Sequence, residues 1–265
     1  KKDGTQRYIC KECGKRFTAL TNTIFDSKKI PISEWIEYLL HLFEFHSINS
    51  TAYDNRNSPT TGKYWLIKTF EVLKGIQNDV VLDGTVYLDE TYFTKVRSKL
   101  VTKDGKKLRG ISRNKIGVGV ACNETKSIFI VTGTSKPSRK STKETYSQHI
   151  ARGSVLVHDD EHSHSILIEE LELESIVYPT AETKELSDKD NPLYPVNNLH
   201  LLLKQFIRNH GAYDREHLQD WLNLFWFIMN EPKDKYDKVL KFIEMAVLSP
   251  KKVRYRDAMS SKHSK

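Results

Sequence analysis

The feature that most constrains the fold is a succession of short β-rich runs in the second half of the chain, joined first by turns and then by helical patterns. The runs occupy 85–88, 116–121, 127–131, 154–158 and 176–178. Runs of this length, rich in β-branched residues and bounded by polar turns, predict strands. Strands that alternate with helices predict a sheet covered by helices. We therefore expect an α/β domain here.

The helical patterns complete this order. Apolar residues recur at helical spacing in two sets of segments, one interleaved with the later strands and one following them. The segments are 141–150, 163–173, 196–209, 214–229 and 235–247. Three strands, a helix, a strand, a helix, a strand and further helices form the order of an RNase H-like domain, so we expect a mixed sheet flanked by helices.

The segment before the strands has a different character. Residues 1–29 are polar and rich in turns, whereas residues 30–78 contain three helical patterns. Ser33 is an expected N-cap of the first helix, and Pro59 occupies the first position of the third. Three helices with short turns predict a helix-turn-helix-like, DNA-binding region. A bundle that serves only for packing is the alternative.

The charge of the chain points to a polyanionic partner. Lys and Arg total 42 against 34 Asp and Glu, which gives a formal net charge of +8. Basic residues gather in 1–29, 94–115, 136–152 and the tail 250–265, whereas acidic residues gather in 159–190. Such blocks favour loops that contact a phosphate backbone, although solvated surface loops would give the same pattern.

The remaining composition narrows the class of protein. No apolar run approaches the roughly 18 residues of a membrane span, and three cysteines are too few for a disulfide scaffold of this size. We expect a protein without a membrane partner, located in the cytoplasm. Because the chain begins with Lys1 rather than Met, we also expect it to lack its natural beginning.

Polar residues lie at the ends of two expected strands and at the start of one expected helix, where they could form one site. Asp89 follows the first strand, Asp159 follows the fourth, and Asn197 opens the helix that contains Lys204. Strand ends of an open α/β sheet deliver side chains to a common crevice. Two carboxylates held close together repel each other unless a cation lies between them. Oxygen ligands favour Mg²⁺ or Mn²⁺, which can promote in-line phosphoryl displacement.

Several stretches together resemble one known family. The sequence is similar to the DDE transposases of bacterial insertion sequences that carry an N-terminal zinc ribbon. The matching stretches are 8–17, 23–25, 86–93, 153–159 and 196–200, followed by Lys204. The resemblance implies an RNase H-like core, Mg²⁺-dependent nicking at the ends of a DNA element, and strand transfer by the freed 3′-hydroxyl. It also implies double-stranded DNA as partner, a homodimer or higher assembly, and association with the bacterial nucleoid.

The resemblance also assigns roles to residues. Asp89 matches the first catalytic acid and Asp159 the second, and Lys204 would hold a phosphate near the scissile bond. The third acid is commonly Glu, seven residues before a Lys or Arg; here that position is Asn197. An amide oxygen can bind a metal without adding charge. Asn198 and His200 are the rivals for this third ligand.

The cysteines and the basic residues complete the expected site residues. Cys10 and Cys13 form half of a zinc site, which needs four ligands. We expect DNA contacts from seven basic residues: Lys63, Lys68, Lys106, Lys107, Arg109, Arg139 and Lys140. The expected domains are a partial zinc ribbon at 1–29, a helical region at 30–78, the catalytic domain at 79–249 and a basic tail at 250–265.

Three alternatives stay open at this stage. Glu90 adjoins Asp89 and should point to the opposite face of the strand, although it could also be a ligand. His158, His162 and His164 next to Asp159 could bind zinc in a hydrolase acting on small phosphoesters. The replacement of the usual Glu by Asn197 would also fit a catalytically inactive relative that only binds DNA.

Overall fold

The structure is a computed structural model that describes residues 6–26, 30–95, 104–105, 110–210, 215–249 and 251–259. The chain divides into two compact units. One consists of Lys1–Lys74 with Glu231–Lys265, and the other is Gly75–Asn230. Within the described residues, no helix has both the length and the apolar character that crossing a membrane requires.

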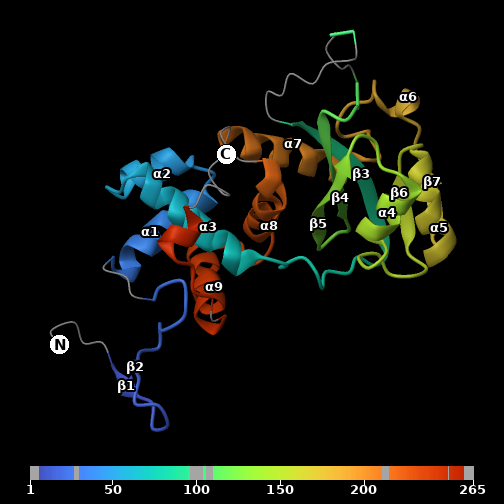
Figure 1. Ribbon diagram of the computed structural model, residues 1–265. Helices are drawn as coiled ribbons and strands as arrows, with labels where there is room; N and C mark the ends of the chain where they lie inside the picture. The colour runs from blue at the N-terminus through green and yellow to red at the C-terminus, as the bar shows by residue number, and fades with distance from the viewer. Residues whose placement is uncertain are drawn as a thin grey trace. The chain divides into compact units, whose positions relative to one another are not determined.

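The second unit is built on a five-stranded mixed sheet (Figure 1). Its strands are β3 (Thr85–Thr94), β4 (Lys115–Cys122), β5 (Ser127–Thr134), β6 (Val155–His158) and β7 (Glu174–Val177). They lie in the order β5-β4-β3-β6-β7. The strand β4 runs antiparallel to both of its neighbours, β3 and β5, and β6 and β7 run parallel to β3. This order confirms the expected RNase H-like α/β fold.

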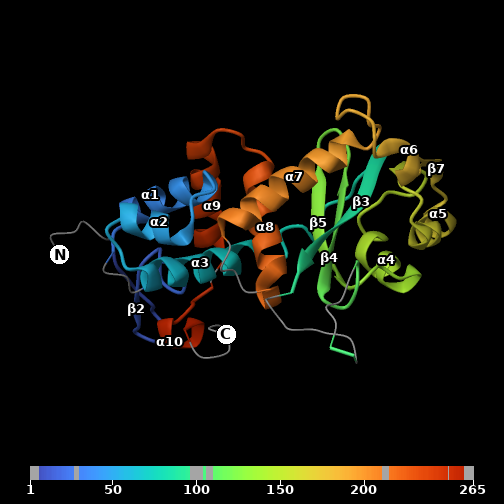
Figure 2. The same ribbon diagram turned by 90° about the horizontal axis from the view of Figure 1, so that it is seen from above.

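Helices cover both faces of this sheet (Figure 2). On one face lie α4 (Arg139–Tyr146) and α5 (Ser165–Leu171), preceded by the 3-10 turn η1 (His162–His164). On the other lie α7 (Tyr194–Asn209) and α8 (Leu218–Met229), with the 3-10 turn η2 (Arg215–His217) before α8. The short helix α6 (Thr180–Thr183) follows β7. Tyr146, Leu156 and Leu167 belong to the buried core between the sheet and the α4–α5 layer.

Two details differ from the expected elements and affect the site. The first strand of the sheet does not end before Asp89 but continues to Thr94, because it pairs with β4 along its whole second half. Only its pairing with β6 ends at Leu88. The helix α7 begins at Tyr194, so Asn197 lies in its first turn and is not its N-cap, which is Leu193.

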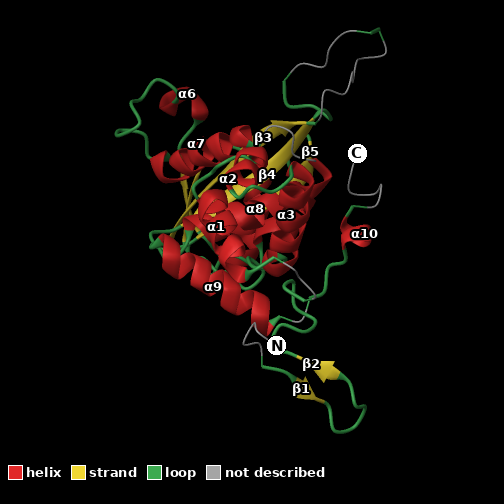
Figure 3. Cartoon of the chain, turned by 90° about the vertical axis from the view of Figure 1, so that its left-hand side faces the viewer, coloured by secondary structure: helices red, strands yellow, loops and turns green. Residues whose placement is uncertain are grey.

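The other unit is mainly helical (Figure 3). It contains a small antiparallel ladder of β1 (Tyr8–Ile9) and β2 (Arg16–Phe17). Its helices are α1 (Ile32–Phe43), α2 (Ile48–Asp54), α3 (Pro59–Leu73), α9 (Lys235–Leu248) and α10 (Tyr255–Ala258). The first begins two residues earlier than expected, with Pro31 rather than Ser33 as its N-cap.

Aromatic packing explains why α9 belongs to the helical unit. The rings of Trp35 and Trp65 stack 4.4 Å apart in its core, and Phe43 of α1 meets Phe242 of α9 edge to face. The helix α9 contacts both α1 and α3. The division into units therefore differs from the expected boundary, which placed everything from 79 to 249 in one domain.

Lys68 corrects one expectation. Its side chain lies in the core of the helical unit and is 1% exposed, so it is not available for a DNA contact. The ammonium group donates a hydrogen bond to the carbonyl of Ile24 and lies 4.8 Å from the centre of the Tyr64 ring. A buried ammonium needs such partners, because an unpaired buried charge is very costly.

Candidate active site

Asp89 and Asp159 come from neighbouring parallel strands. The last paired residues of β3 and β6 are Leu88 and His158, and the two aspartates each follow one of them. Both side chains are about a quarter exposed, at 25% for Asp89 and 23% for Asp159. The strand register thus places the two residues at neighbouring positions at the end of the β3–β6 pairing. Their role as metal ligands stays a prediction.

The electrostatics of Asp89 show that this carboxylate lies in an unfavourable place. Burial, followed by the charges of Asp159 and Glu90, raises the pKa of Asp89 to about 7. The backbone amide of Glu90, which donates to Asp89 Oδ1 at 2.7 Å, opposes this rise. Burial also raises the pKa of Asp159, against the amide of Glu161, which donates to it at 3.1 Å. The pair thus carries negative charge that a cation would stabilise.

His200 is the α7 residue whose side chain meets Asp89. Its Nδ1 lies 3.7 Å from Asp89 Oδ2, and its ring is 6% exposed. Its Nε2 is buried without a hydrogen-bond partner. Burial and then the charge of Lys204 lower the pKa of His200 to about 4. His200 is therefore a neutral imidazole whose Nδ1 lies beside Asp89 and whose Nε2 has no hydrogen-bond partner. The neutral imidazole is the form that binds metals.

The other α7 positions share the same stripe of the helix. Asn197 lies three residues before His200, and Lys204 lies four residues after it, which is the spacing of neighbours on one helical face. Asn197 and Asn198 are half-buried, and Lys204 is exposed. Since the measured contact with Asp89 belongs to His200, the geometry favours His200 among the three candidates, and the role of Asn197 stays a prediction.

Glu90 points away from Asp89 into the opposite side of the sheet. Its carboxylate accepts a hydrogen bond from the Tyr146 hydroxyl at 2.8 Å and lies 3.3 Å from His164 Nε2. Burial lowers the pKa of His164, but the contact with Glu90 and the charges of Asp159 and Asp89 outweigh it, so this pKa is raised. Glu90 and His164 thus form a buried ion pair, a role that sequence reasoning missed.

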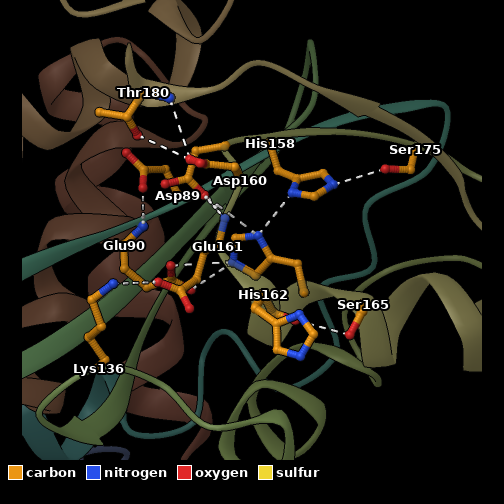
Figure 4. A network of polar contacts seen from close by, with 12 residues as sticks. Asp89, Glu90, Lys136, His158, Asp160, Glu161, His162, Ser165, Ser175 and Thr180 are labelled. Atoms are coloured by element: carbon orange, nitrogen blue, oxygen red, sulfur yellow. Dashed lines mark hydrogen bonds and ion pairs between the residues drawn. The ribbon is translucent and has the colours of Figure 1, made fainter.

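The Glu90–His164 ion pair connects both to Asp159 and to a second histidine, His158, and Figure 4 labels the His158–Ser175 end of this chain of contacts. His164 Nδ1 lies 3.1 Å from His158 Nδ1 and 3.8 Å from Asp159 Oδ1. His158 Nε2 in turn lies 3.0 Å from the Ser175 hydroxyl on β7. This chain of contacts fixes the rings beside Asp159. His162, the third histidine of the zinc alternative, is exposed and does not join the cluster.

A glycine makes room for the Glu90 contact. Gly119 lies opposite Glu90 in the β3–β4 register. A Cβ atom at Gly119 would overlap the Tyr146 hydroxyl, which crosses β4 at this point to reach Glu90. The sequence signal was available: Glu90 has the same strand parity as the buried Val86 and Leu88, so its charge required a buried partner.

The expected DNA-binding residues have varied surroundings. Arg139 forms an ion pair with Glu169 at 2.7 Å, and Lys140 is 85% exposed with Glu144 at 3.8 Å. Lys63 is half-buried on α3. The three remaining residues, Lys106, Lys107 and Arg109, lie outside the described residues. Apart from Lys68, these assignments stay predictions.

Cys10 and Cys13 lie in a tight turn between β1 and β2. The amide of Gly14 donates to the Cys10 carbonyl at 2.9 Å, and the amide of Cys10 donates to Lys15 at 2.9 Å. Backbone amides of Cys13 and Glu12 lower the pKa of the Cys10 thiol. Across the part of the chain that the structure describes, neither cysteine belongs to a cluster of three or more His, Cys, Asp or Glu ligands.

Comparisons with known proteins give weak likenesses. No protein-family model matches the chain, and no curated protein does. Similar solved structures include the Mos1 strand transfer complex, at 14% identity and a TM-score of 0.36, covering 86% of this chain and 80% of that one. The Mos1 transposase catalytic domain with raltegravir and Mg matches at 16% identity and a TM-score of 0.33, covering 72% of this chain and 96% of that one. Because these identities and TM-scores are low, the fold is assigned from the order of the strands in the sheet, and the candidate site is described from its own side chains.

Proposed function

We propose that the protein is a DNA transposase of the DDE class, which nicks the ends of its DNA element and transfers the freed 3′-hydroxyl to a target strand. One observation carries the proposal: Asp89 and Asp159 lie at matching positions of paired parallel strands in an RNase H-like sheet. The family resemblance of the sequence and the net charge of +8 point the same way.

The donor set of this site fits a divalent cation. Asp89 and Asp159 supply oxygen ligands. Burial, followed by the charges of Asp159 and Glu90, raises the pKa of Asp89, and a bound cation would oppose this rise. His200, whose Nδ1 lies 3.7 Å from Asp89 Oδ2, is the third ligand favoured by geometry, and Asn197 is the one favoured by the family pattern. Mg²⁺ or Mn²⁺ bound there would activate the attacking hydroxyl and stabilise the leaving oxygen.

The surrounding residues act on the substrate and on the ligands. Lys204 is exposed two turns along α7 from Asn197, where its ammonium can contact a phosphate next to the scissile bond. The Glu90–His164 pair holds the ring beside Asp159 and so fixes the orientation of that carboxylate.

Cleavage of DNA by the purified full chain tests the proposal. The substrate carries the sequences that flank the coding region, and Mg²⁺ or Mn²⁺ is added or removed with a chelator. We expect nicking that requires the metal and drops at least about 100-fold in Asp89→Asn and Asp159→Asn, as loss of transition-state stabilisation predicts. Asp160→Asn is the matched control, because Asp160 adjoins Asp159 but contacts Thr180 instead.

Three outcomes would contradict the proposal. Equal DNA binding with no metal-dependent nicking in any form of the protein would favour the DNA-binding relative. Turnover of small phosphoesters without DNA, and without salt dependence, would favour the phosphoesterase. Equal loss in Asp159→Asn and Asp160→Asn would mean that general disturbance of the loop, not ligand loss, causes the effect.

The third ligand can be assigned by the same assay. If the 3.7 Å contact with Asp89 marks the ligand, His200→Ala should raise the metal concentration needed for half-maximal nicking. This rise should be larger than in Asn197→Ala or Asn198→Ala. The reverse order would assign Asn197.

The finer expectations belong to this proposal. A transposase joins two element ends, so we propose a homodimer or higher assembly on double-stranded DNA in the bacterial cytoplasm at the nucleoid. We further propose that Cys10 and Cys13, whose turn and lowered thiol pKa suit metal binding, are half of a zinc ribbon. Metal analysis of the protein with and without Cys10→Ser tests this assignment.

A further inference from the structure

A second histidine–carboxylate cluster lies in the helical unit and shares no residue with the candidate active site. His41 sits in the last turn of α1, and His46 follows the helix. The backbone of Phe45 adopts a left-handed conformation, with φ of 65°. This turn lets the amide of His46 donate to the carbonyl of His41 at 3.1 Å, so the chain folds back on the helix end. The two imidazoles are thereby brought together, with their Nδ1 atoms 3.2 Å apart.

Asp54 adds a carboxylate to the two rings. It is the last residue of α2, and its Oδ2 lies 3.7 Å from His41 Nδ1 and 3.9 Å from His46 Nδ1. The hydroxyl of Ser50, one turn earlier, donates to the same oxygen at 3.5 Å. Three potential ligand atoms from two helices and the loop between them therefore converge on one point.

The spacing of these atoms is close to that of a metal site. Metal–ligand bonds of about 2.0–2.1 Å in a tetrahedron place neighbouring ligand atoms about 3.3 Å apart. The observed separations of 3.2, 3.7 and 3.9 Å need only small side-chain movements to match. The side chains are 27%, 40% and 35% exposed for His41, His46 and Asp54, which leaves room for a water molecule as fourth ligand.

A simple ion pair would not need this arrangement. His217 and Asp220 of α8 form such a pair at 3.1 Å with similar exposure, and within the described residues they are not part of a three-ligand cluster. In the helical unit, by contrast, both imidazoles present the same nitrogen to each other and to one carboxylate oxygen. Two imidazoles with a carboxylate favour a borderline transition metal over Mg²⁺.

We propose that His41, His46 and Asp54 bind a zinc ion that fastens the end of α1 to α2. This site is separate from the carboxylates of the sheet unit and from the Cys10–Cys13 turn. It goes beyond the proposed transposase function, because zinc binding here would stabilise the helical unit whether or not the protein cleaves DNA.

Zinc binding by the full chain tests the proposal. Cys10→Ser and Cys13→Ser are introduced into every protein, so that the thiolates cannot bind zinc. Equilibrium dialysis and metal analysis then count the bound ions, with calorimetric melting as a second measurement. We expect His46→Ala to lose one zinc ion per chain and the zinc-dependent rise in melting temperature of the helical unit. His217→Ala, the matched control, should keep both.

A second variant covers the case in which His46→Ala does not fold. If His46→Ala does not fold, as judged by circular dichroism, Asp54→Asn gives the same comparison with a nearly isosteric change. Equal zinc content and equal melting shifts in the parent, His46→Ala and Asp54→Asn would overturn the proposal. The result is independent of the transposase proposal, because loss of DNA cleavage would leave the zinc count unchanged.

Discussion

Two clusters of the molecule have the same composition but different surroundings. His158, Asp159 and His164 in the sheet unit, like His41, His46 and Asp54 in the helical unit, bring their ligand atoms within 4.8 Å of one another. In the first cluster His164 is 0% exposed, His158 is 4% exposed and the Asp159 side chain is 23% exposed, whereas the three side chains of the second cluster are 27–40% exposed. Burial of the imidazoles therefore distinguishes the two clusters, and residue type does not.

The difference in burial determines which groups can form hydrogen bonds with the two clusters. In the sheet unit, Glu90, Tyr146 and Ser175 provide hydrogen bonds to polar groups that are buried away from solvent. In the helical unit, water can replace any lost contact. We therefore expect substitutions in the first cluster to change the free energy of unfolding strongly, and those in the second to act only through a ligand.

The largest expected effect comes from closing the space beside Glu90. Gly119→Ala places a methyl group where the Tyr146 hydroxyl reaches Glu90. Either Tyr146 moves away and leaves a buried carboxylate poorly bonded, or the strand shifts. We expect a loss of about 3–5 kcal/mol in the free energy of unfolding of the sheet unit, measured by urea denaturation.

Gly117→Ala in the same strand is the control for this change. A Cβ there would meet the hydroxyl end of Thr132, which can rotate, and Gly117 faces Tyr92 rather than Glu90 in the register. We expect a clearly smaller loss. If both alanines cost the same, strand packing in general explains the effect, and the Glu90 contact is not special.

The sequence predicted the sheet more fully than the surroundings of its site. Strand and helix patterns in 85–178 identify the fold, and Asp89 and Asp159 follow the last paired residues of β3 and β6, as their places in the sequence suggest. The contact of His200 with Asp89 depends on how α7 lies on the sheet, which no local pattern encodes. The burial of Lys68 depends likewise on the loop that supplies the Ile24 carbonyl.

The second effect tests whether the charge of Asp89 lowers the free energy of unfolding when no metal is bound. The folded pKa of about 7 exceeds the ordinary value of 3.8, so the folded state binds more protons between these values, and stability falls as pH rises through this window. At pH 8, without metal, Asp89→Asn should raise the free energy of unfolding by about 2–3 kcal/mol, less than the full shift implies, since a quarter of the side chain is exposed.

Magnesium provides the internal check on this prediction. Wild-type protein should gain stability when Mg²⁺ is added, whereas Asp89→Asn should gain much less, as measured by thermal melting at constant pH. A variant that is less stable than wild type without metal would show that the carboxylate contributes to the fold and is not in repulsion with its neighbours.

The third effect tests whether burial of a histidine outside the cluster is enough to make the free energy of unfolding depend on pH. His210 packs against Phe206 and Trp221, and both of its ring nitrogens are buried without a partner. Burial lowers its pKa to about 4 from the ordinary 6.5. The unfolded state then binds more protons between these values, so its contribution is complete above pH 6.5 and is lost as pH falls toward 4.

Replacing this ring measures the contribution. His210→Phe keeps an aromatic ring in place and should reduce the fall in unfolding free energy between pH 6.5 and 4.5 by about 1–2 kcal/mol. An unchanged slope in His210→Phe would assign the acid sensitivity to the histidines of the cluster instead.

The smallest expected effect on the free energy of unfolding comes from the exposed cluster of His41, His46 and Asp54. In the presence of a chelator, His46→Ala should change the free energy of unfolding by less than about 0.5 kcal/mol, because exposed ion pairs are weak and water can solvate Asp54 in place of the ring. Urea denaturation of the helical unit, followed by the fluorescence of the buried Trp35 and Trp65, measures this difference. A loss of about 2 kcal/mol or more without metal would mean that His46 holds the turn at Phe45 by its own contacts. The two clusters would then differ less than their exposure suggests, because both would be structural before any ion is bound.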